Sequence, residues 1–380
     1  MKKKVLVITG TRADYGIYYP VLRALEEEHA LELHLLVTGM HLSPQHGYTL
    51  DAIQKDGFRV SAKVDCLLQG STHANMSRSI GIAIMGMTQA VEALEPDFVV
   101  VLGDRGEMLA AAIVSSHMNI PLVHLHGGEV SGTIDESVRH AISKLAHIHF
   151  VATNGSRERL IRLGEEPWRI HVVGAPRIET MMNTSLPELE RTKRKYDLNI
   201  DNDYVLFAYH PVTTEEGDMH ILGKMMEVLL AGENEVICVM PNSDAGADAI
   251  VDVYNRFSTR KGMHLVTSFE QLDYLTMLKN AKILIGNSSS GIIEAASFHV
   301  PVINIGTRQT GRERSVNTID IAADELELTS AMEYAMSEPF QQIVKAADNI
   351  YSRDNTSSRI VDILNRTSKS EQLIQKTITY

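Results

Sequence analysis

The segment between residues 124 and 141 concentrates groups that can move protons. It reads His-Leu-His-Gly-Gly-Glu-Val-Ser-Gly-Thr-Ile-Asp-Glu-Ser-Val-Arg-His-Ala and combines three histidines, three carboxylates and an arginine with three glycines. The segment overlaps the end of an apolar run at 120–124, which is typical of a short buried strand. Because open α/β sheets place their chemistry at the carboxyl ends of parallel strands, we expect this segment to line a catalytic site.

The side chains of this segment that best fit acid/base roles are His126, Glu129, Asp135 and Glu136. Carboxylates that share a cleft push each other's pKa values apart, as acid and base roles require. His124 belongs to the strand itself and is equally well explained as a buried, hydrogen-bonded core histidine. Arg139 could pair with Asp135 one helical turn away. The spacing lacks His-Glu-x-x-His and His-Cys patterns, so we expect no metal.

Two further strand ends in the first half carry candidate residues. Asp104 follows the apolar run 98–102, where a carboxylate can act as a general base, accept a sugar hydroxyl or cap the next helix. Glu107 falls in the first turn of that helix, where it complements the helix dipole. Arg12 lies in the glycine-bracketed turn after residues 5–9, and its guanidinium suits a phosphate or carboxylate, a surface ion pair being the alternative. This turn is not Gly-x-Gly-x-x-Gly, so a nicotinamide cofactor is not expected.

The second half contains a turn suited to phosphate. Gly286-Asn-Ser-Ser-Ser-Gly291 follows an apolar run and precedes a helical pattern, so free N–H groups and hydroxyls favour an anion there. It lacks the P-loop lysine, and a capped helix without a ligand is the alternative. His210 ends the strand predicted at 204–208 and, as a cation, would hold a diphosphate or protonate a leaving group, although a lone histidine is more often structural.

Three more groups could complete a nucleotide site. Glu294 lies where it could accept both hydroxyls of a ribose. Arg308 and Arg312 lie on a loop bracketed by glycines. Phe269 could offer its ring to a nucleobase, although packing in the core explains it equally well.

Short β-branched runs alternate with helical patterns, which indicates parallel sheets covered by helices on both faces. Strands are predicted at 5–9, 32–37, 98–102, 121–125, 149–152, 204–208, 235–240, 263–266, 282–285 and 300–304. Helices are predicted at 18–28, 72–94, 107–118, 136–146, 156–163, 222–230, 247–257, 270–279, 291–298, 322–336 and 359–365.

The alternation is interrupted by a polar stretch at 180–202, which suits a surface helix and a connector. We therefore expect two Rossmann-like domains with a cleft between them, at 1–180 and 181–358. A C-terminal helix within 359–380 should pack back on the first domain, and residues 369–380 should form a loosely held tail.

The composition excludes several classes of protein. The chain has 380 residues, too many for one typical domain, and its net charge of −12 argues against a nucleic-acid partner. No run approaches the ~18 residues of a membrane span, and the N-terminal apolar run is too short for a signal peptide. Cys66 and Cys238 lack metal-ligand spacing and suit buried thiols, so a cytoplasmic location is expected.

Seven segments in the same order resemble the UDP-N-acetylglucosamine 2-epimerase family over about residues 3–320. They are Gly10-Thr-Arg-Ala-Asp-Tyr-Gly16, Gly103-Asp-Arg105, His124-Leu-His-Gly-Gly-Glu129, Asp135-Glu-Ser-Val-Arg-His-Ala-Ile-Ser-Lys144, His210-Pro211, Gly286-Asn-Ser-Ser-Ser-Gly291 and Arg308-Gln-Thr-Gly-Arg312. The non-hydrolysing branch typically has Arg-Pro-Glu where this chain has Arg12-Ala-Asp14. It also favours Glu-Ala-Gly-Leu-Arg where this chain has His126-Gly-Gly-Glu-Val130. The resemblance is therefore to the hydrolysing branch, which feeds sialic-acid synthesis.

The resemblance implies a GT-B-like fold that binds a UDP-sugar in the interdomain cleft without a cofactor. It implies hydrolysis of UDP-N-acetylglucosamine to UDP and N-acetylmannosamine by anti elimination to a 2-acetamidoglucal and then hydration. A sugar of the legionaminic-acid path, UDP-2,4-diacetamido-2,4,6-trideoxyglucose, is the alternative substrate, and a GT-B glycosyltransferase or a sugar sensor would be different classes. It also implies a homodimer or a dimer of dimers. Helices 72–94 and 107–118, rich in small and methionine side chains, could supply its face, although the same composition is equally typical of buried core helices.

The same resemblance assigns roles to the candidate residues. Proton transfer falls to Asp104, Glu129 and Asp135, with His126 and Glu136 beside them. The UDP-sugar would be held by Arg12, Arg105, His210, Phe269, Gly286, Ser288, Ser289, Ser290, Gly291, Glu294, Arg308 and Arg312.

Overall fold

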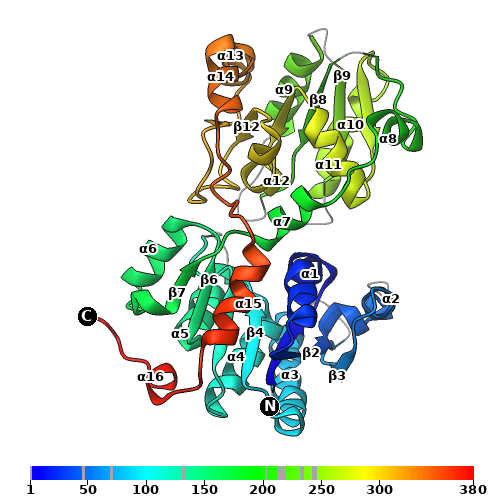
Figure 1. Ribbon diagram of the computed structural model, residues 1–380. Helices are drawn as coiled ribbons and strands as arrows, with labels where there is room; N and C mark the ends of the chain where they lie inside the picture. Colours follow the sequence, from blue (N-terminus) through cyan, green and yellow to red (C-terminus); the bar gives the residue numbers. More distant parts are fainter. Residues whose placement is uncertain are drawn as a thin grey trace. The chain divides into compact units, whose positions relative to one another are not determined.

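The chain forms two compact α/β units, each built on a parallel sheet, as the alternation of strands and helices predicts. The computed structural model describes residues 2–44, 48–68, 72–130, 134–201, 203–212, 219–231, 235–241 and 246–380. One unit comprises Met1–Thr180 with Tyr351–Tyr380, and the other comprises Met181–Ile350 (Figure 1). The chain thus re-enters the first unit at Tyr351, ahead of the position near 359 expected from the sequence.

Among the described residues, the first unit has a seven-stranded sheet in the order β3-β2-β1-β4-β5-β6-β7. The strands are β1 Lys3–Thr9, β2 Leu31–Thr38, β3 Val60–Val64, β4 Phe98–Leu102, β5 Leu122–Leu125, β6 Ile148–Val151 and β7 Ile170–Val172. The central strands are continuous apolar runs because both of their faces are covered. Val5 and Val7 pack in one hydrophobic cluster, while Leu6 and Ile8 pack in another on the opposite face.

Helices cover both faces of this sheet. They are α1 Arg12–Glu27, α2 Leu50–Lys55, α3 His73–Leu94, α4 Gly106–His117, α5 Ile134–Leu145, α6 Asn154–Arg162, α15 Thr356–Arg366 and α16 Glu371–Ile374, with short 3₁₀ turns at Gly39–Leu42 and Pro167–Arg169. Helix α7, Pro176–Asn183, runs from this unit into the second. Side chains of α1 and α15 fill the first cluster, and those of α3 and α4 fill the second. In Figure 1 the C-terminal helix α15 lies beside α1, so the two ends of the chain share one core.

The second unit repeats the plan with a sheet in the order β10-β9-β8-β11-β12-β13. Its strands are β8 Tyr204–Ala208, β9 Glu235–Val239, β10 Met263–Val266, β11 Ile283–Gly286, β12 Val302–Ile305 and β13 Thr318–Ile321. Its helices are α8 Leu189–Lys195, α9 Met219–Ala231, α10 Ala247–Phe257, α11 Gln271–Asn280, α12 Ser289–Ile293, α13 Glu325–Met336 and α14 Glu338–Lys345, with a 3₁₀ turn at Ala295–Phe298.

Several elements differ from the sequence predictions for identifiable reasons. Helix α1 begins at Arg12 rather than 18 because Thr11 and Asp14 form a capping box. The helix predicted at 291–298 is two pieces, α12 and a 3₁₀ turn. Strands β3, β7 and β13 and helices α2 and α14 were not predicted. β3, β7 and β13 all lie at sheet edges, where the apolar signal is weak.

The prediction of a loosely held tail at 369–380 is wrong for residues 371–376, which are fastened to the first unit. Leu373 of α16 is 2% exposed and joins the core of the first unit. The side chains of Arg169 and Lys376 tie this segment down through backbone carbonyls. Local composition could not reveal these partners, because they lie more than 200 residues away along the chain. Over the described residues, no helix combines the length and the apolar character that crossing a membrane requires.

Candidate functional site

The candidate residues lie at the point in each sheet where the order of successive strands along the sheet reverses. In the first unit β1 and β4 are neighbours, and they lead into the turns that carry Arg12 and Asp104. In the second unit β8 and β11 are neighbours, and they lead to His210 and to the turn at Gly286. Ligands of open α/β sheets bind outside the carboxyl ends of strands at such switch points. The sequence motifs thus fall at the positions where this architecture binds ligands.

Asp104 is held by an arginine and does not cap the helix that follows. The N-cap residue of α4 is Arg105, whose side chain makes no capping bond, so the capping interpretation of Asp104 is wrong. Gly103, at φ +73°, turns the chain beyond β4. The Asp104 carboxylate then accepts a hydrogen bond from Nη2 of Arg139, which is 6% exposed. A buried cation therefore orients the first candidate base.

Burial and charge act in opposite directions on Asp104. Burial raises the pKa of its carboxyl group, and the nearby charges of Asp135 and Glu129 add to this, whereas Arg139 lowers it. The net pKa is above the ordinary value of 3.8. A carboxylate whose pKa is raised towards neutrality is a stronger base, and catalytic carboxylates are tuned in this way.

His126 and Glu129 form a hydrogen-bonded pair beside this carboxylate. Nδ1 of His126 lies 2.6 Å from Oε1 of Glu129. His126 adopts φ +60°, a left-handed conformation that is uncommon for a non-glycine residue, and its N–H donates to Phe150 O. Nη1 of Arg139 donates to the Glu129 carbonyl at 3.0 Å. Arg139 thus holds the backbone of this loop and Asp104 together.

His124 is a core residue, one of the two interpretations that the sequence leaves open. Its side chain is 0% exposed, with Nε2 2.8 Å from Gly103 O and Nδ1 3.0 Å from Ser143 Oγ. Burial lowers its pKa to about 3, so it is neutral at physiological pH. It joins β5 to the turn that carries Asp104 and does not itself reach a substrate.

Helix α5 carries the other two carboxylates on its first turn. Asp135 is exposed, and Glu136 lies 3.6 Å from His140 through Oε1 and Nε2. Residues 131–133 of the loop before α5 lie outside the described residues. Sequence reasoning gave Arg139 only a local role towards Asp135. Its spacing from Ile142 and Ser143, both buried, indicates that it faces inward, and this signal was missed.

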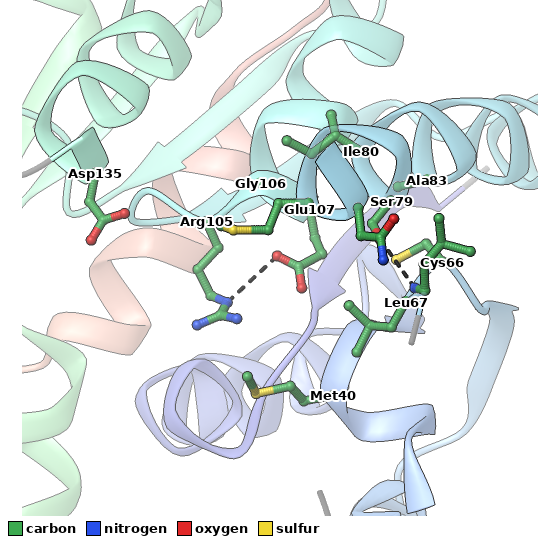
Figure 2. A pocket seen from close by; sticks show the side chains of 13 residues that line it. Met40, Cys66, Leu67, Ser79, Ile80, Ala83, Arg105, Gly106, Glu107 and Asp135 are labelled. Atoms are coloured by element: carbon green, nitrogen blue, oxygen red, sulfur yellow. Dashed lines mark hydrogen bonds and ion pairs between the residues drawn. The ribbon is translucent and has the colours of Figure 1, made fainter. Parts of the chain in front are cut away.

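A cavity of about 330 Å³ lies beside these groups within the first unit (Figure 2). Much of its lining is apolar and comes from Met40, Leu67, Met76 and Ile80, among other residues. Arg105, Glu107 and Asp135 also line it, and Nε of Arg105 lies 3.5 Å from Oε2 of Glu107. The cavity can therefore receive a group that carries both methyl and polar functions.

The first turn presents Arg12 outward on a rigid base. Asp14 is 4% exposed and accepts hydrogen bonds from the N–H groups of Gly10 and Thr11. The Thr9 hydroxyl donates to the same carboxylate and lies 3.0 Å from Nε2 of His41. The Arg12 side chain is exposed and has no ion pair within the described residues, so the surface ion-pair alternative finds no support there.

The turn at Gly286 in the second unit leaves no room for a side chain. Gly286 has φ +135°, and a Cβ atom there would lie 2.1 Å from Ala208 O. The next residue, Asn287, accepts from His210 N at 2.7 Å and donates to His210 O at 2.8 Å. This reciprocal pair fixes the backbone of His210 next to the turn. Sequence reasoning did not single out Asn287, whose only signal is its place between Gly286 and the serines.

The rest of this turn is arranged as a capped helix start. The Ser288 side chain caps α12, which has only five residues, and Ser290 Oγ accepts from the Tyr274 hydroxyl at 2.9 Å. Ser289 opens α12, and Gly291 lies where a Cβ atom would come within 2.8 Å of Val302. Glu294 ends the helix and is 6% exposed.

The two arginines of the neighbouring loop differ in their contacts. Nη1 of Arg308 donates to Asn287 O at 3.1 Å, so this arginine is brought to the turn. The Arg312 backbone N–H donates to Gln309 O, and its side chain is half-buried.

Phe269 packs edge to face on Tyr196 with ring centres 4.6 Å apart, which supports a packing role for this ring. No three His, Cys, Asp or Glu side chains in the described ranges are grouped so that they could hold a metal ion.

Comparison with known proteins identifies the family of the chain. The sequence profile of the family described as UDP-N-acetylglucosamine 2-epimerase matches residues 23–365. The chain is 39% identical to a hydrolysing UDP-N,N'-diacetylbacillosamine 2-epimerase of Legionella pneumophila, with all of both chains covered. It is 37% identical to a UDP-N-acetylglucosamine 2-epimerase of Neisseria meningitidis serogroup B over 88% of each chain.

Solved structures show the same GT-B-like fold. A putative UDP-N-acetylglucosamine 2-epimerase from Listeria monocytogenes has a TM-score of 0.79 at 20% identity, covering 98% of this chain and 99% of that one. A Neisseria meningitidis UDP-GlcNAc 2-epimerase bound to UDP-GlcNAc has a TM-score of 0.76 at 18% identity, covering 96% and 100%. The family profile and the relatives above 30% identity place this chain in the UDP-N-acetylglucosamine 2-epimerase family.

Proposed function

We propose that this protein is a hydrolysing 2-epimerase that converts a UDP-linked 2-acetamido sugar and water into UDP and the free 2-epimeric sugar. The observation that carries the proposal is the cluster of Asp104, Arg139, Glu129 and His126 at the switch point of the first sheet. It offers a carboxylate whose pKa is raised by burial and an arginine that orients it, which suits removal of a weakly acidic carbon-bound proton. Membership in the epimerase family supplies the substrate class.

The proposed reaction has two steps. A carboxylate removes the proton at C2 while the C1–O bond to UDP breaks, which leaves UDP and a 2-acetamidoglucal with a C1–C2 double bond. A base then takes a proton from water as the hydroxyl adds to C1, and an acid delivers a proton to C2 on the face opposite to the one from which the first proton was removed, which inverts C2. Asp104, Glu129 and Asp135 are the proposed proton-transfer groups, with His126 and Glu136 beside them. Desolvation of the site would protect the glucal until hydration.

The nucleotide is assigned to the second unit and to the first turn. His210, Arg12 and the serines Ser288, Ser289 and Ser290 would neutralise the diphosphate as charge develops on it. Glu294 would hold the ribose and Phe269 the uracil. Arg105, Arg308 and Arg312 are proposed as further anion contacts, and Gly286 and Gly291 permit close approach of the backbone.

Two substrates are candidates. UDP-N-acetylglucosamine, expected from the sequence, is supported by the relative from Neisseria meningitidis serogroup B that is named for it. UDP-N,N'-diacetylbacillosamine, the diacetamido-trideoxy sugar, is supported by the Legionella relative and by a Campylobacter jejuni relative at 35% identity. A role in sialic-acid synthesis is supported by a 32% identical polysialic acid biosynthesis protein of Escherichia coli.

The test is turnover of each sugar nucleotide in D₂O. We expect release of UDP together with a free 2-epimeric sugar that carries deuterium at C2, because the proton is lost and then replaced from solvent. Running both nucleotides side by side identifies the substrate from the higher kcat/KM. A product that keeps its C2 proton would rule out the elimination route.

The same assay separates the other classes. A GT-B glycosyltransferase needs an acceptor, so sugar release with water as the sole acceptor contradicts that assignment. A nucleotide-sugar sensor binds both nucleotides without turnover.

We also propose a cytoplasmic location. Two buried cysteines that form no disulfide fit the reducing conditions there.

We further propose that a second copy of the chain covers α3. This helix has no charged residue between Arg78 and Glu92, yet Ile82 and Met85, which are neighbours on one face of this stretch, are 37% and 71% exposed. Exposed apolar side chains on an uncharged helix face are typical of a subunit interface. We expect Met85→Glu to convert a dimer into a monomer in sedimentation velocity, whereas Leu326→Glu, at a site 73% exposed on α13, leaves it unchanged. A parent protein that sediments as a monomer would contradict this proposal.

A further inference from the structure

The C-terminal segment 371–376 is fastened to the end of the helix that carries the candidate acid/base residues. Nζ of Lys376 donates to the carbonyl oxygens of Ser143, Lys144 and Ala146 at 3.4, 2.8 and 2.6 Å. These residues form the last turn of α5 and its exit, where helix carbonyls lack partners within the helix. A cation at this end also complements the helix dipole. Lys376 is therefore a C-cap supplied from far along the chain.

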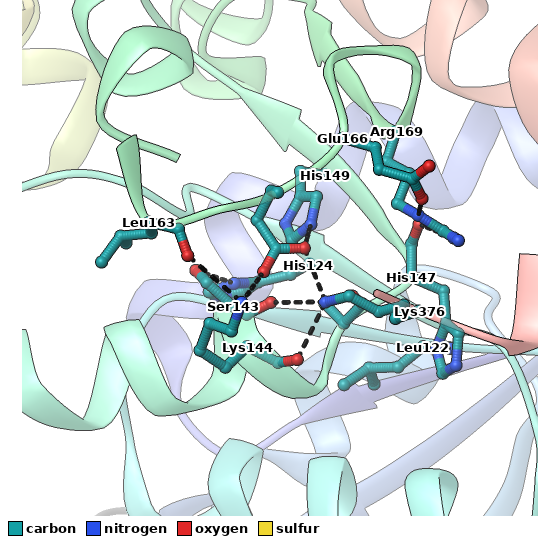
Figure 3. Close-up of polar contacts among 12 residues, drawn as sticks. Leu122, His124, Ser143, Lys144, His147, His149, Leu163, Glu166, Arg169 and Lys376 are labelled. Atoms are coloured by element: carbon teal, nitrogen blue, oxygen red, sulfur yellow. Dashed lines mark hydrogen bonds and ion pairs between the residues drawn. The ribbon is translucent and has the colours of Figure 1, made fainter. Parts of the chain in front are cut away.

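The charge of Lys376 is balanced by a buried carboxylate. Oε2 of Glu165, which is 1% exposed, lies 2.6 Å from Lys376 Nζ. Oε1 of Glu165 lies 2.7 Å from Lys144 Nζ, and His149 approaches Oε2 at 3.2 Å. Burial alone would raise the pKa of Glu165, but the bonds from His149 and the two lysines lower it to about 2. Figure 3 shows Lys376 reaching into this group from the tail.

A second buried cation holds the tail in place. Arg169 is 1% exposed, and its Nη1 and Nη2 donate to Leu373 O at 2.8 Å and to Gln372 O at 2.7 Å. Its guanidinium also lies 4.2 Å from the Trp168 ring. These bonds bind the tail backbone, so they fix the position from which Lys376 extends.

The opposite end of α5 reaches the candidate site. Asp135 and Glu136 lie on its first turn, and Arg139 pairs with Asp104. Ser143, whose carbonyl Lys376 binds, also contacts His124 through its hydroxyl, and His124 contacts Gly103 O. A displacement of the last turn of α5 is therefore transmitted to the Asp104 turn by two routes. A helix of this length is about 18 Å of rigid rod, so its ends move together.

We propose that Lys376 is a positioning residue for the reaction, which sets α5 so that Arg139 meets Asp104 and the carboxylates of the first helical turn face the substrate. The inference rests on the proposed function for its catalytic part. Its structural part, the control of α5 by the tail, can be measured without turnover.

The experiment compares Lys376→Met with Lys376→Arg in the full-length chain. Methionine keeps the length of the side chain but removes the charge, whereas arginine restores a cation. We expect Lys376→Met to speed amide hydrogen exchange along all of α5 and to lower kcat by about tenfold or more, because small misplacements of catalytic groups are costly. KM should change little, since the proposed nucleotide contacts are not attached to α5.

The pH profile provides a readout that simple loss of stability does not move. Arg139 lowers the pKa of Asp104 against burial, Asp135 and Glu129, so a displaced Arg139 should shift the acidic limb of kcat/KM to higher pH. Lys376→Arg should restore both kcat and the position of the acidic limb of kcat/KM. Lys376 itself is surrounded by Glu165, Lys144, Arg169 and His149, and the assays should stay below pH 7, because burial lowers its pKa to about 8.

Thr356→Val is the matched control. It removes a hydroxyl of the same unit that donates to Val173 O at 2.7 Å and to Arg353 O at 3.1 Å, and it leaves α5 untouched. It should therefore cost stability without changing exchange in α5 or the acidic limb of the pH profile. Unchanged exchange in α5 of Lys376→Met would overturn the proposal. Faster exchange that is confined to the last turn of α5, with kcat and the acidic limb of kcat/KM as in the parent, would also overturn it. If the parent turns over no sugar nucleotide, the proposed function fails, and exchange in α5 still decides the coupling.

Discussion

Asp104→Asn should reduce turnover by about 10³-fold or more while nucleotide binding persists. Asparagine has nearly the shape of aspartate and can still meet Arg139, but it cannot accept a proton from carbon. General acid–base groups typically contribute about 10² to 10⁴ in rate, and Asp104 is the half-buried carboxylate bonded to Arg139. The measurement is kcat with the better of the two sugar nucleotides, together with UDP affinity by calorimetry.

The parent enzyme should show the corresponding pH dependence. Burial raises the pKa of Asp104 above 3.8, so kcat/KM should fall as the pH drops through this raised value, because protonation removes the base. Glu129→Gln and Asp135→Asn, measured in parallel, will show whether one carboxylate dominates. Turnover by Asp104→Asn within tenfold of the parent would contradict its role. Unchanged binding without turnover in both the parent and the variant would indicate a sensor.

Gly286→Ala should disable the second unit's turn, with an effect on stability of about 3 kcal/mol or more. The backbone conformation at φ +135° is costly for an L side chain, and the added Cβ would lie 2.1 Å from Ala208 O, a backbone atom that cannot move independently. Asn287 N also donates to Ala208 O, at 3.1 Å. Relief of the clash would therefore displace the Asn287 contacts to His210, and we expect UDP affinity to fall by about 100-fold.

Gly223→Ala is the control for this variant. Gly223 lies in α9 of the same unit, and a Cβ atom there would meet nothing within 4 Å. Alanine in a helix interior should raise stability by about 0.5–1 kcal/mol, with UDP affinity unchanged. Urea denaturation and calorimetry measure both effects. A Gly286→Ala protein with the stability and the UDP affinity of the parent would contradict this prediction, because it would show that the turn tolerates a side chain.

The parts of the fold that depend on local periodicity could be predicted from the sequence. Continuous apolar runs such as β4 and β8 were placed at their observed bounds. A strand that is buried on both faces is apolar at every position, so its ends are marked by the first polar residues. The predicted bounds are wrong where a capping side chain sets the start of a helix. Thr11 and Asp14 move the start of α1 to Arg12, and this capping box was overlooked.

The sequence by itself determined the class of fold and the segments that carry the chemistry, since strand ends and glycine turns are local features. Only the tertiary structure decided the partners. Arg139 meets Asp104 across 35 residues, Asn287 binds His210 across 77, and Lys376 caps α5 across 230. Such pairs depend on strand order and on how the helices pack, and neither follows from the spacing of residues along the chain. The physical reason is that a buried charge needs a partner, but its identity is set by the fold around it.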